Sequence, residues 1–471
     1  MSHPLRKRLA ELDREIASKR RKLFKLEKTR SAVETELHAA ATYPILTLPV
    51  EITAEIFLWL RDLQPLCVPR CQMSGTIAVA GVCRAWRAIA LATPRLWSNL
   101  RINFDGIEHE AVLKPLWVEC FIDKWISRSR NCPLSLDFQS RSVLHFTESR
   151  LRHILRRYST RIQTLSLDLG SRDLRPLRFD SAAFPLLEKV YLQYHSNPDE
   201  DVDFPRPMTI FANAPRFREL NMQWSQLDTT LLALPWSQLT KFQGRIKNLD
   251  LFALASNLVE VKCALFPNEG VSSTTLITHH NMKILILDND CNLIQHLALP
   301  SLQHLDIAKM DNHELLEPFL KRSSPPLASL SMQALKGPTG NCFNRLCECM
   351  ALVASTLEDV KLCNVPEDLK GISTISGIFP NLRSLQISLR NTDHESGLAK
   401  LLDFLYSPRC TLRACKFLWA RSPFLDRRAF AGTLRGTHTH KVDTISGHLA
   451  RLVQGGMSVY IGTEDKNYLV G

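Results

Sequence analysis

The chain has 471 residues, of which 45% are hydrophobic and 23% are charged, and its formal net charge is +12. This length exceeds one ordinary domain, so we expect two or three units or one elongated repeat array. The sequence shows neither an apolar N-terminal leader nor an apolar run of about 18 residues, which argues against secretion and membrane insertion. The 13 cysteines follow no regular spacing, so we expect reduced thiols and a cytoplasmic or nuclear protein.

Residues 1–40 predict a coiled-coil helix. Apolar residues alternate at intervals of four and three, and only Lys19 and Arg30 interrupt the series. We expect this helix to pair, for example as a homodimer through residues 5–38, with a solvated single helix as the alternative. Residues 5–30 hold eleven Lys or Arg and four acidic residues, so a basic nucleic-acid-binding arm is a second alternative. The apolar positions are Leu5, Leu9, Leu12, Ile16, Leu23, Leu26, Val33 and Leu37.

The stretch LPVEITAEIF at residues 48–57 predicts an amphipathic helix that begins abruptly at a proline. Pro49 suits a helix start because its missing N–H would be unpaired there, and Glu51 lies where the helix dipole favours a carboxylate. A second helical pattern follows in residues 76–97. These short helices carry more apolar surface than they can bury alone, which implies a partner. In the first helix, a narrow inward-facing stripe is predicted for residues that recur every fourth position, namely Ile52, Ile56 and Leu60.

Residues 48–102 resemble an F-box of the type common in mushroom-forming fungi. The resemblance rests on LPVEI at 48–52, VCRAWRAIA at 82–90 and PRLWSNLRI at 94–102. F-box proteins bind the adaptor Skp1 through this short helical module and thereby join a cullin-RING ubiquitin ligase. By motif, the resemblance implies that the Skp1-binding or module-core residues are Leu48, Pro49, Ile52, Ile56, Val82, Cys83, Trp86 and Arg87.

From about residue 160, hexamers with apolar residues at positions one, four and six recur. Ten intervals span 250 residues and average 25, within the roughly 20–29 residues of leucine-rich repeats. Such hexamers predict short parallel strands whose inward side chains close a continuous core. The usual asparagine after the third apolar position is mostly absent, so we expect an irregular convex side of helices and loops. The first positions are Ile162, Leu187, Phe217, Leu239, Leu258, Met282, Leu302, Leu327, Leu357, Leu382 and Leu412.

Polar residues between the inward positions should face the concave surface of this solenoid. Their charges are mixed in sign, which favours a protein target over a phosphate backbone, so we do not expect nucleic acid there. A recognition surface usually depends on a few anchors, and the aromatic candidates are Tyr191, Trp224 and Trp419. The predicted target-binding residues are Lys189, Tyr191, Gln193, Glu219, Asn221, Gln223, His304 and Asp306.

We predict no catalytic, cofactor-binding or metal-binding residue. The sequence contains no P-loop, no nucleophile elbow and no zinc-protease motif. Cys342, Cys347 and Cys349 lack a second pair at zinc-site spacing, and we interpret them as buried helical thiols.

The prediction is therefore an α/β protein: a leucine-rich-repeat solenoid with an N-terminal helical F-box and a preceding coiled-coil helix. Its domains are a coiled-coil helix at 1–40, an F-box at 41–105, a helical linker at 106–158, the solenoid at 159–440 and a C-terminal cap at 441–471. The resemblance implies a non-catalytic substrate-recognition subunit of an SCF-type ubiquitin ligase, with Skp1, a cullin and an unidentified protein target as partners. The alternatives are a scaffold that acts outside a ligase and a coiled-coil adaptor whose basic N-terminus binds nucleic acid.

Overall fold

The computed structural model divides into two compact units. The helical unit comprises Met1–Pro65, Gln72–Trp97 and Ser127–Arg130, and the repeat unit comprises Leu66–Cys71, Ser98–Ile126 and Asn131–Gly471. No helix in the described ranges combines the length and the hydropathy that a membrane crossing requires. The structure describes residues 3–40, 48–61, 66–67, 75–103, 115–139, 148–170, 183–195, 209–227, 229–265, 276–289, 291–310, 313–333, 342–365, 379–389, 405, 412–419, 452–463 and 467.

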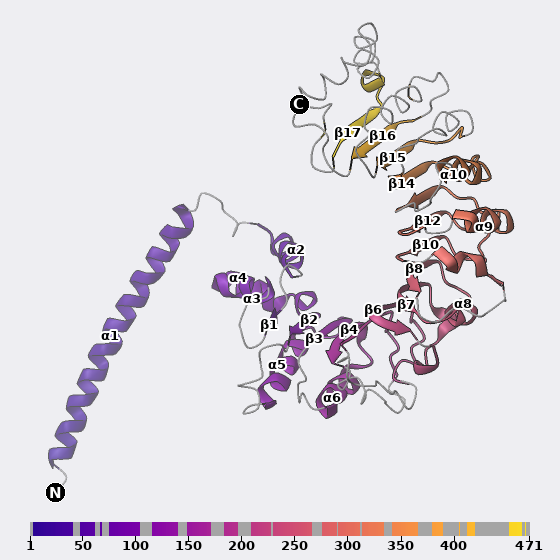
Figure 1. The fold of residues 1–471 in the computed structure, drawn as a ribbon. Coiled ribbons are helices and arrows are strands. Elements are labelled where there is room, and N and C mark those ends of the chain that lie inside the picture. The colour runs from indigo at the N-terminus through magenta and orange to yellow at the C-terminus, as the bar shows by residue number, and fades with distance from the viewer. Residues whose placement is uncertain are drawn as a thin grey trace. The chain divides into compact units, whose positions relative to one another are not determined.

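The helical unit contains one long helix and several short ones. α1 spans His3–Ala40 (Figure 1). The carbonyl of Pro49, which precedes α2, accepts the first helical hydrogen bond from the N–H of Thr53 at 3.0 Å. The proline thus starts the helix at a position where its missing N–H leaves no bond unmade. The short elements are α2 (Val50–Leu60), α3 (Gly75–Val82), α4 (Arg84–Ala92) and the 3₁₀ turn η2 (Pro94–Trp97).

The repeat unit is built on a long parallel sheet. Among the described residues, fifteen strands pair in chain order, and their pairings are parallel. The predicted mixed α/β fold with many parallel strands is confirmed, and it is consistent with a leucine-rich-repeat solenoid. A separate parallel pair joins β9 (Ile277–Thr278) to β11 (Leu297–Ala298). The long sheet consists of β1 (Leu66–Cys67), β2 (Asn99–Asn103), β3 (Leu134–Gln139), β4 (Ile162–Gly170), β5 (Lys189–His195), β6 (Glu219–Leu227), β7 (Lys241–Ile246), β8 (Glu260–Leu265), β10 (Ile284–Leu287), β12 (His304–Ile307), β13 (Ser329–Met332), β14 (Asp359–Val365), β15 (Ser384–Leu389), β16 (Ala414–Trp419) and β17 (Ser458–Gly462).

Helices and 3₁₀ turns return the chain from one strand to the next. Figure 1 shows α8, α9 and α10 on the same side of the strands. Short 3₁₀ turns take the place of helices in other returns, so the irregular mixture that we predicted is present. The helices are α5 (Pro115–Arg128), α6 (Glu148–Tyr158), α8 (Asp250–Leu254), α9 (Leu316–Ser323) and α10 (Cys342–Ala351), and the turns are η3 (Thr229–Leu231), η4 (Trp236–Gln238), η5 (Cys291–His296) and η6 (His313–Leu315).

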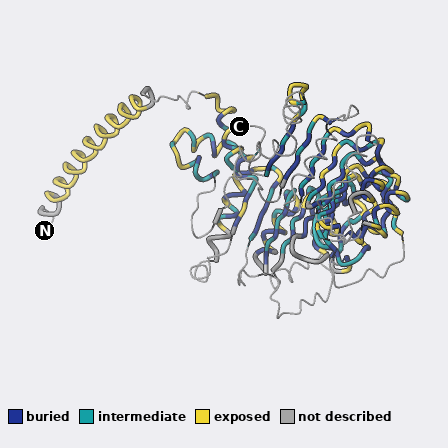
Figure 2. Tube along the Cα trace, turned by 45° about the horizontal axis from the view of Figure 1, so that its top comes forward, coloured by how far each residue is buried: buried dark blue, intermediate teal, exposed yellow. Residues whose placement is uncertain are grey.

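The apolar positions of each hexamer form the core of the repeat unit. Leu302, Leu305 and Ile307 are at most 1% exposed. Leu305 is aligned between residues of the same kind, Leu285 on β10 and Leu330 on β13, and Figure 2 shows buried residues running along the strands. The alternating inward and outward pattern of the predicted strands is confirmed here.

The sheet extends beyond the predicted solenoid at both ends. β2 lies within the segment predicted as an F-box, and β3 lies within the segment predicted as a helical linker. Sequence analysis missed the hexamers of both strands. The β2 hexamer begins with Trp97, which had been assigned to the F-box motif, and the β3 hexamer begins with Pro133 in place of the usual apolar residue. At the other end, β17 pairs with β16, so the segment predicted as a cap contributes a further strand. The aligned core pairs of β2 and β3 are Leu100 with Leu136 and Ile102 with Phe138, all buried.

The same backbone connection, which we call the repeat joint, links successive repeats. In this connection, a carbonyl just before one strand accepts two N–H groups from the next repeat: the carbonyl of Arg218 accepts those of Thr240 and Lys241 at 2.9 and 3.0 Å. The return segments are outside this joint and differ in length. The same two-donor arrangement recurs at the carbonyls of Glu188, Thr240, Val259, Lys283, Gln303, Ala328, Glu358 and Arg383.

Asparagine side chains reinforce the joint at several repeats. Asn257 Nδ2 donates to the carbonyl of Ser237 at 2.7 Å, and Asn381 Nδ2 donates to the carbonyl of Ser355 at 2.6 Å. Each asparagine immediately precedes the first apolar position of its hexamer. At these repeats, side-chain and backbone hydrogen bonds therefore tie one turn to the turn before it.

Candidate protein-binding surfaces

Helix α2 turns apolar side chains toward solvent. Ile52 and Ile56 are 50% and 37% exposed, whereas Thr53 and Phe57 are buried. The prediction that Ile52 and Ile56 face inward is therefore wrong, and the buried stripe lies one residue further along the helix. Phe57 takes the inward position because its ring packs against Trp86, with the ring centroids 5.0 Å apart, which removes a larger apolar area from water than isoleucine would.

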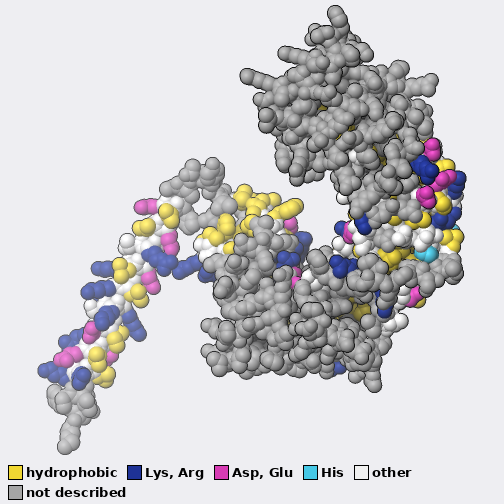
Figure 3. All heavy atoms as spheres, in the orientation of Figure 1, with side chains coloured by type: hydrophobic (Ala, Val, Ile, Leu, Met, Phe, Trp, Pro, Cys, Tyr) yellow, Lys and Arg dark blue, Asp and Glu magenta, His cyan; other side chains and the backbone are white. Residues whose placement is uncertain are grey.

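One residue that sequence analysis did not select enlarges this surface. Trp59 is 80% exposed. Trp59 follows Ile56 by three residues and Ile52 by seven, a spacing that places the three side chains on one helix face. Pro49 is also exposed, and Figure 3 shows hydrophobic side chains gathered around α2. We call the exposed apolar residues Leu48, Ile52, Ile56 and Trp59 the α2 surface.

The predicted residues of the motif VCRAWRAIA differ in role: one is exposed, and the others make contacts within the helical unit. Val82 is 62% exposed. Cys83 caps α4, because its Sγ accepts the N–H of Trp86 at 3.4 Å, and Arg87 Nε donates to the carbonyl of Ala80 at 2.9 Å. The structure therefore gives Cys83, Trp86 and Arg87 contacts within the helical unit and leaves Val82 as an exposed apolar side chain.

Trp97 anchors the end of the helical unit. It is 2% exposed, its Nε1 donates to the carbonyl of Ala90 at 2.7 Å, and the Arg128 guanidinium lies 4.4 Å from a ring centroid. Together with the Phe57–Trp86 pair, these contacts give the helical unit a small aromatic core. The exposure of the α2 surface is therefore a property of a packed unit, not of an isolated helix.

The strand face of the repeat unit carries the first group of predicted target-binding residues. The carboxylate of Glu219 accepts the Lys189 ammonium at 2.9 Å and the Tyr191 hydroxyl at 3.1 Å, and Asn221 Nδ2 donates to Gln243 Oε1 at 3.1 Å. The hydrogen bond to Glu219 raises the pKa of Lys189, and burial raises the pKa of Tyr191. Lys189, Tyr191 and Glu219 form one network, and Asn221 with Gln243 forms a separate hydrogen-bonded pair.

Charges alternate in sign across neighbouring strands of this face. The register aligns Lys189, Glu219, Lys241 and Glu260 in one row, and Lys241 Nζ lies 2.7 Å from a carboxylate oxygen of Glu260. Sequence analysis did not select Lys241, whose hexamer LTKFQG at 239–244 departs from the pattern by having Gly244 at its sixth position. The paired charges largely neutralise one another, so this row is selective for neither anions nor cations.

The strand face becomes less charged beyond β8. Ile284 and Ile286 are half-exposed on β10, and the predicted residues His304 and Asp306 are exposed and half-exposed on β12. In the described part of the chain, Asp306 Oδ1 and Ser331 Oγ are buried without a hydrogen-bond partner, although the register aligns the two residues. Unpaired buried polar atoms are costly, so these two atoms destabilise this part of the strand face.

The structure describes only some of the remaining predicted residues. Gln193 is half-buried on β5. The side chains of Gln223, Trp224 and Trp419 lie outside the described residues, which leaves Tyr191 as the described aromatic candidate. Cys347 and Cys349 are buried on α10, in agreement with the interpretation of buried thiols.

Helix α1 exposes the described part of its apolar seam. Seven of its seam residues are between 48% and 71% exposed. The two basic seam residues form ion pairs within the helix, Lys19 with Glu15 at 2.8 Å and Arg30 with Glu34 at 2.9 Å. Whether this seam binds another helix stays a prediction.

The comparisons with known proteins give distant similarities. No protein-family model and no curated protein matches the chain. Among solved structures, it is similar to the crystal structure of a TLR13–ssRNA13 complex, with 14% identity and a TM-score of 0.32, over 55% of this chain and 39% of that chain. It is also similar to the crystal structure of a Rad7 and Elc1 complex in yeast, with 15% identity and a TM-score of 0.33, over 84% of this chain and 92% of that chain. The chain spans less than half of the first of these proteins, and neither similarity defines a family for it.

Proposed function

We propose that this protein is a non-catalytic substrate receptor of an SCF-type ubiquitin ligase. In this proposal, the α2 surface and Val82 bind a Skp1-type adaptor, which connects the chain to a cullin. The strand face of the repeat unit binds a protein target. The observation that carries the proposal is the apolar α2 surface, which lies within the segment that resembles an F-box and remains exposed on a packed unit.

An exposed apolar surface of this kind needs a partner. Contiguous apolar patches on a soluble unit are typical of protein-binding sites, whereas apolar residues scattered singly need no explanation. Trp59 is the most exposed member at 80%, and tryptophan is enriched among residues that dominate binding energies. Glu55 and Arg95 form an ion pair at 3.4 Å in the same unit and would contribute to a polar rim.

Two binding surfaces on one chain would serve a receptor directly. Binding the adaptor with one unit and the target with the other raises the effective concentration of the target near the ligase. Such a receptor needs no catalytic residue of its own, since the transfer chemistry belongs to other subunits of the complex.

Purification of the full chain from cells separates the proposal from its two alternatives. A Skp1-type adaptor together with a cullin supports a ligase receptor. The adaptor without a cullin favours a scaffold outside a ligase, and nucleic acid bound through the basic N-terminus favours the coiled-coil adaptor.

The α2 surface itself is tested by measuring the affinity of the full chain for a purified Skp1-type adaptor. Leu48→Ala with Ile52→Ala should weaken binding by about 2–4 kcal/mol, because both side chains would be desolvated in the complex. Both are exposed in the free chain, so the melting temperature should stay the same. Leu254→Ala in the repeat unit is the matched control, because Leu254 is 46% exposed. Unchanged adaptor affinity in the double variant, or an equal loss in the control, contradicts the assignment.

A further inference from the structure

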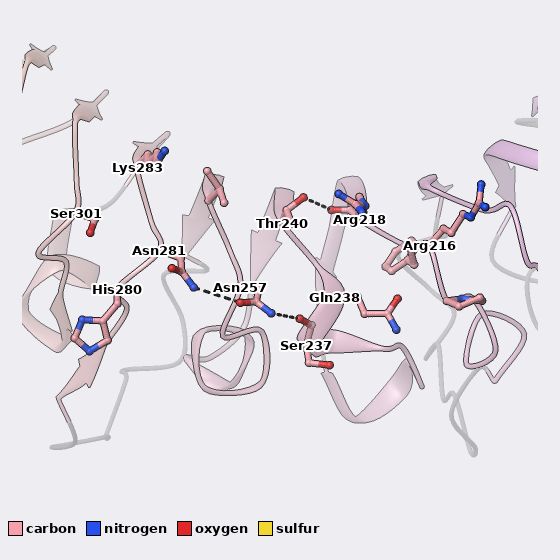
Figure 4. Close-up of a pocket in the computed structure, with 13 residues that line it drawn as sticks. Arg216, Arg218, Ser237, Gln238, Thr240, Asn257, His280, Asn281, Lys283 and Ser301 are labelled. Carbon is pink, nitrogen blue, oxygen red and sulfur yellow. Dashed lines mark hydrogen bonds between the residues drawn. The ribbon is translucent and has the colours of Figure 1, made fainter.

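A basic pocket lies at the rim of the repeat unit, where the chain enters strands β6 to β10. It has a volume of about 670 Å³. Its cationic side chains come from separate repeats: Arg216 and Arg218 precede β6, and Lys283 precedes β10. His280 also lines the pocket (Figure 4). We call this feature the rim pocket.

The cations of the rim pocket are not neutralised by neighbouring acids. Arg216, Arg218 and Lys283 are all exposed, and none forms an ion pair with another described residue. Among the described lining residues there is no aspartate or glutamate. The adjacent strand face differs, because Lys189 and Lys241 are each paired with a glutamate there. The rim pocket therefore presents three exposed cations, with no acidic side chain among its described lining residues.

The floor of the pocket is polar and fixed by hydrogen bonds. Asn257 Nδ2 donates to the carbonyl of Ser237 at 2.7 Å, and Asn281 Nδ2 contacts Asn257 Oδ1 at 3.3 Å (Figure 4). These bonds belong to the asparagine contacts between repeats, so the floor is held by the fold before any ligand binds. A ligand would meet a preorganised surface, which lowers the entropic cost of binding.

The spacing of the cations selects an extended anionic ligand. Arg218 and Lys283 enter strands that are separated by β7 and β8 in the sheet order. Three strand steps of about 4.8 Å place the two positions roughly 14 Å apart, and an extended peptide rises about 3.4 Å per residue. Acidic side chains about four residues apart would then reach both cations from the same face of the peptide.

The lining favours a peptide over a single-stranded nucleic acid. Nucleic-acid grooves combine positive charge with exposed aromatic rings on which bases stack. The one Phe, Tyr or Trp among the described lining residues is Phe217, and it is 0% exposed. Polar groups such as Ser237 and Thr240 instead offer hydrogen bonds along the path between the cations.

We infer that the rim pocket binds an extended acidic segment of a partner protein, with two carboxylates about four residues apart. One carboxylate contacts Arg218 with Arg216, and the other contacts Lys283. This inference rests on the proposed function in one respect: the proposed function identifies the partner as the ligase target. The binding itself requires neither the α2 surface nor an adaptor.

The test measures fluorescence anisotropy of labelled peptides with the full chain. The probe is an 11-residue peptide of Gly, Ser and Asn that carries Asp at positions 4 and 8. One comparison peptide carries both Asp residues at positions 4 and 5, and another carries Asn at positions 4 and 8. A labelled oligothymidine of similar length represents nucleic acid. The spaced peptide should bind most tightly, and its Kd should rise with salt concentration.

Variants then assign the binding to the pocket. Arg218→Gln and Lys283→Gln should each weaken the spaced peptide on the order of tenfold, because each removes one charge-assisted contact. Arg413→Gln is the matched control, since Arg413 is exposed and occupies the same place in a later repeat. It should leave the Kd unchanged. The melting temperature of each variant shows that the exposed substitutions leave the fold intact.

Three results would overturn the inference. The first is equal affinity for the spaced and adjacent peptides, the second is tighter binding of oligothymidine than of the spaced peptide, and the third is an unchanged Kd in Arg218→Gln and Lys283→Gln. Adaptor affinity, measured on the same variants, should not change. Loss of adaptor binding in the α2 variants with intact peptide binding would separate the two conclusions, and so would the reverse.

Discussion

The helical unit and the repeat unit use apolar residues in opposite ways. In the repeat unit, inward residues such as Leu305 and Leu385 are 1% exposed, whereas Ile52 and Trp59 in the helical unit are 50% and 80% exposed. The hydrophobic effect is the same for both. The difference teaches that the parallel sheet completes its own core by stacking strands, while the helical unit completes only a small aromatic core and leaves other apolar side chains exposed.

The strongest way to break this comparison is to truncate inward leucines of the sheet. Leu305→Ala or Leu385→Ala should each lower the free energy of unfolding by about 2–5 kcal/mol, because each leaves a cavity in a fully packed layer. Thermal and denaturant unfolding of the full chain measure the effect.

The matched outward changes in the same strands should be nearly neutral. His304→Ala and Gln386→Ala should each change the free energy of unfolding by about 0.5 kcal/mol or less, since both side chains alternate with the buried leucines. Ile52→Ala should also be mild, because Ile52 is already half exposed to water. An Ile52→Ala cost as large as that of Leu305→Ala would show that the helical unit relies on this side chain, and the comparison would fail.

Helix α1 sharpens the comparison, because its apolar seam is also exposed. Lys19→Leu with Arg30→Leu should strengthen self-association on the order of tenfold or more, because each change removes a charge from a seam position. Sedimentation of the full chain at several concentrations measures this association.

The control for the seam adds leucines elsewhere on the same helix. Arg21→Leu with Lys28→Leu places them outside the four-and-three series and should change the association much less. Monomers in both variants at high concentration would mean that α1 is a solvated helix, and equal association in both would mean that general hydrophobicity is responsible.

The smallest effect concerns the asparagine contacts between repeats. Asn381→Ala removes the donor to the carbonyl of Ser355 and should lower the free energy of unfolding by about 1 kcal/mol. Gln303→Ala, at an exposed residue of another repeat, should be neutral because only the backbone N–H and carbonyl of Gln303 take part in the repeat joint. Chemical denaturation measures both variants. Equal free energies of unfolding in the two variants would mean that the Asn381 side chain does not help to couple the repeats.

The core of the repeat unit could be predicted from the sequence because its signal is local. Each hexamer places three apolar residues at fixed positions, and burial in a strand alternates with period two. The same rule failed where a hexamer departed from the pattern. Pro133 hid the first position of one hexamer, and Trp97 belonged both to a hexamer and to the motif that resembles an F-box.

The orientation of α2 could not be predicted from its sequence. Apolar residues surround the helix, from Val50 and Ile52 to Phe57 and Trp59, so periodicity does not choose one face. The choice is made by a contact outside the helix, because Phe57 packs on Trp86, which belongs to α4.

The rim pocket could not be predicted from the sequence, for a different reason. Arg218 and Lys283 belong to repeats that are not neighbours in the sequence, and their proximity depends on the strand order and on the lengths of the returns between them. A list of charged residues does not contain that information. The pairing of Lys189 and Lys241 with glutamates, and the lack of ion pairs at Arg218 and Lys283 among the described residues, also follow only from the register.

The repeat joint has a consequence for how such a chain can change during evolution. Its two-donor hydrogen bonds occur alike across a short interval, from Leu239 to Leu258, and across a much longer one, from Leu187 to Phe217. Insertions and deletions in a return therefore need not shift the pairing of the strands, because the polypeptide re-enters the sheet at the same acceptor. Adding residues to a surface loop costs little in closure entropy. One face of the molecule can thus diverge in length from repeat to repeat while the opposite face keeps its geometry.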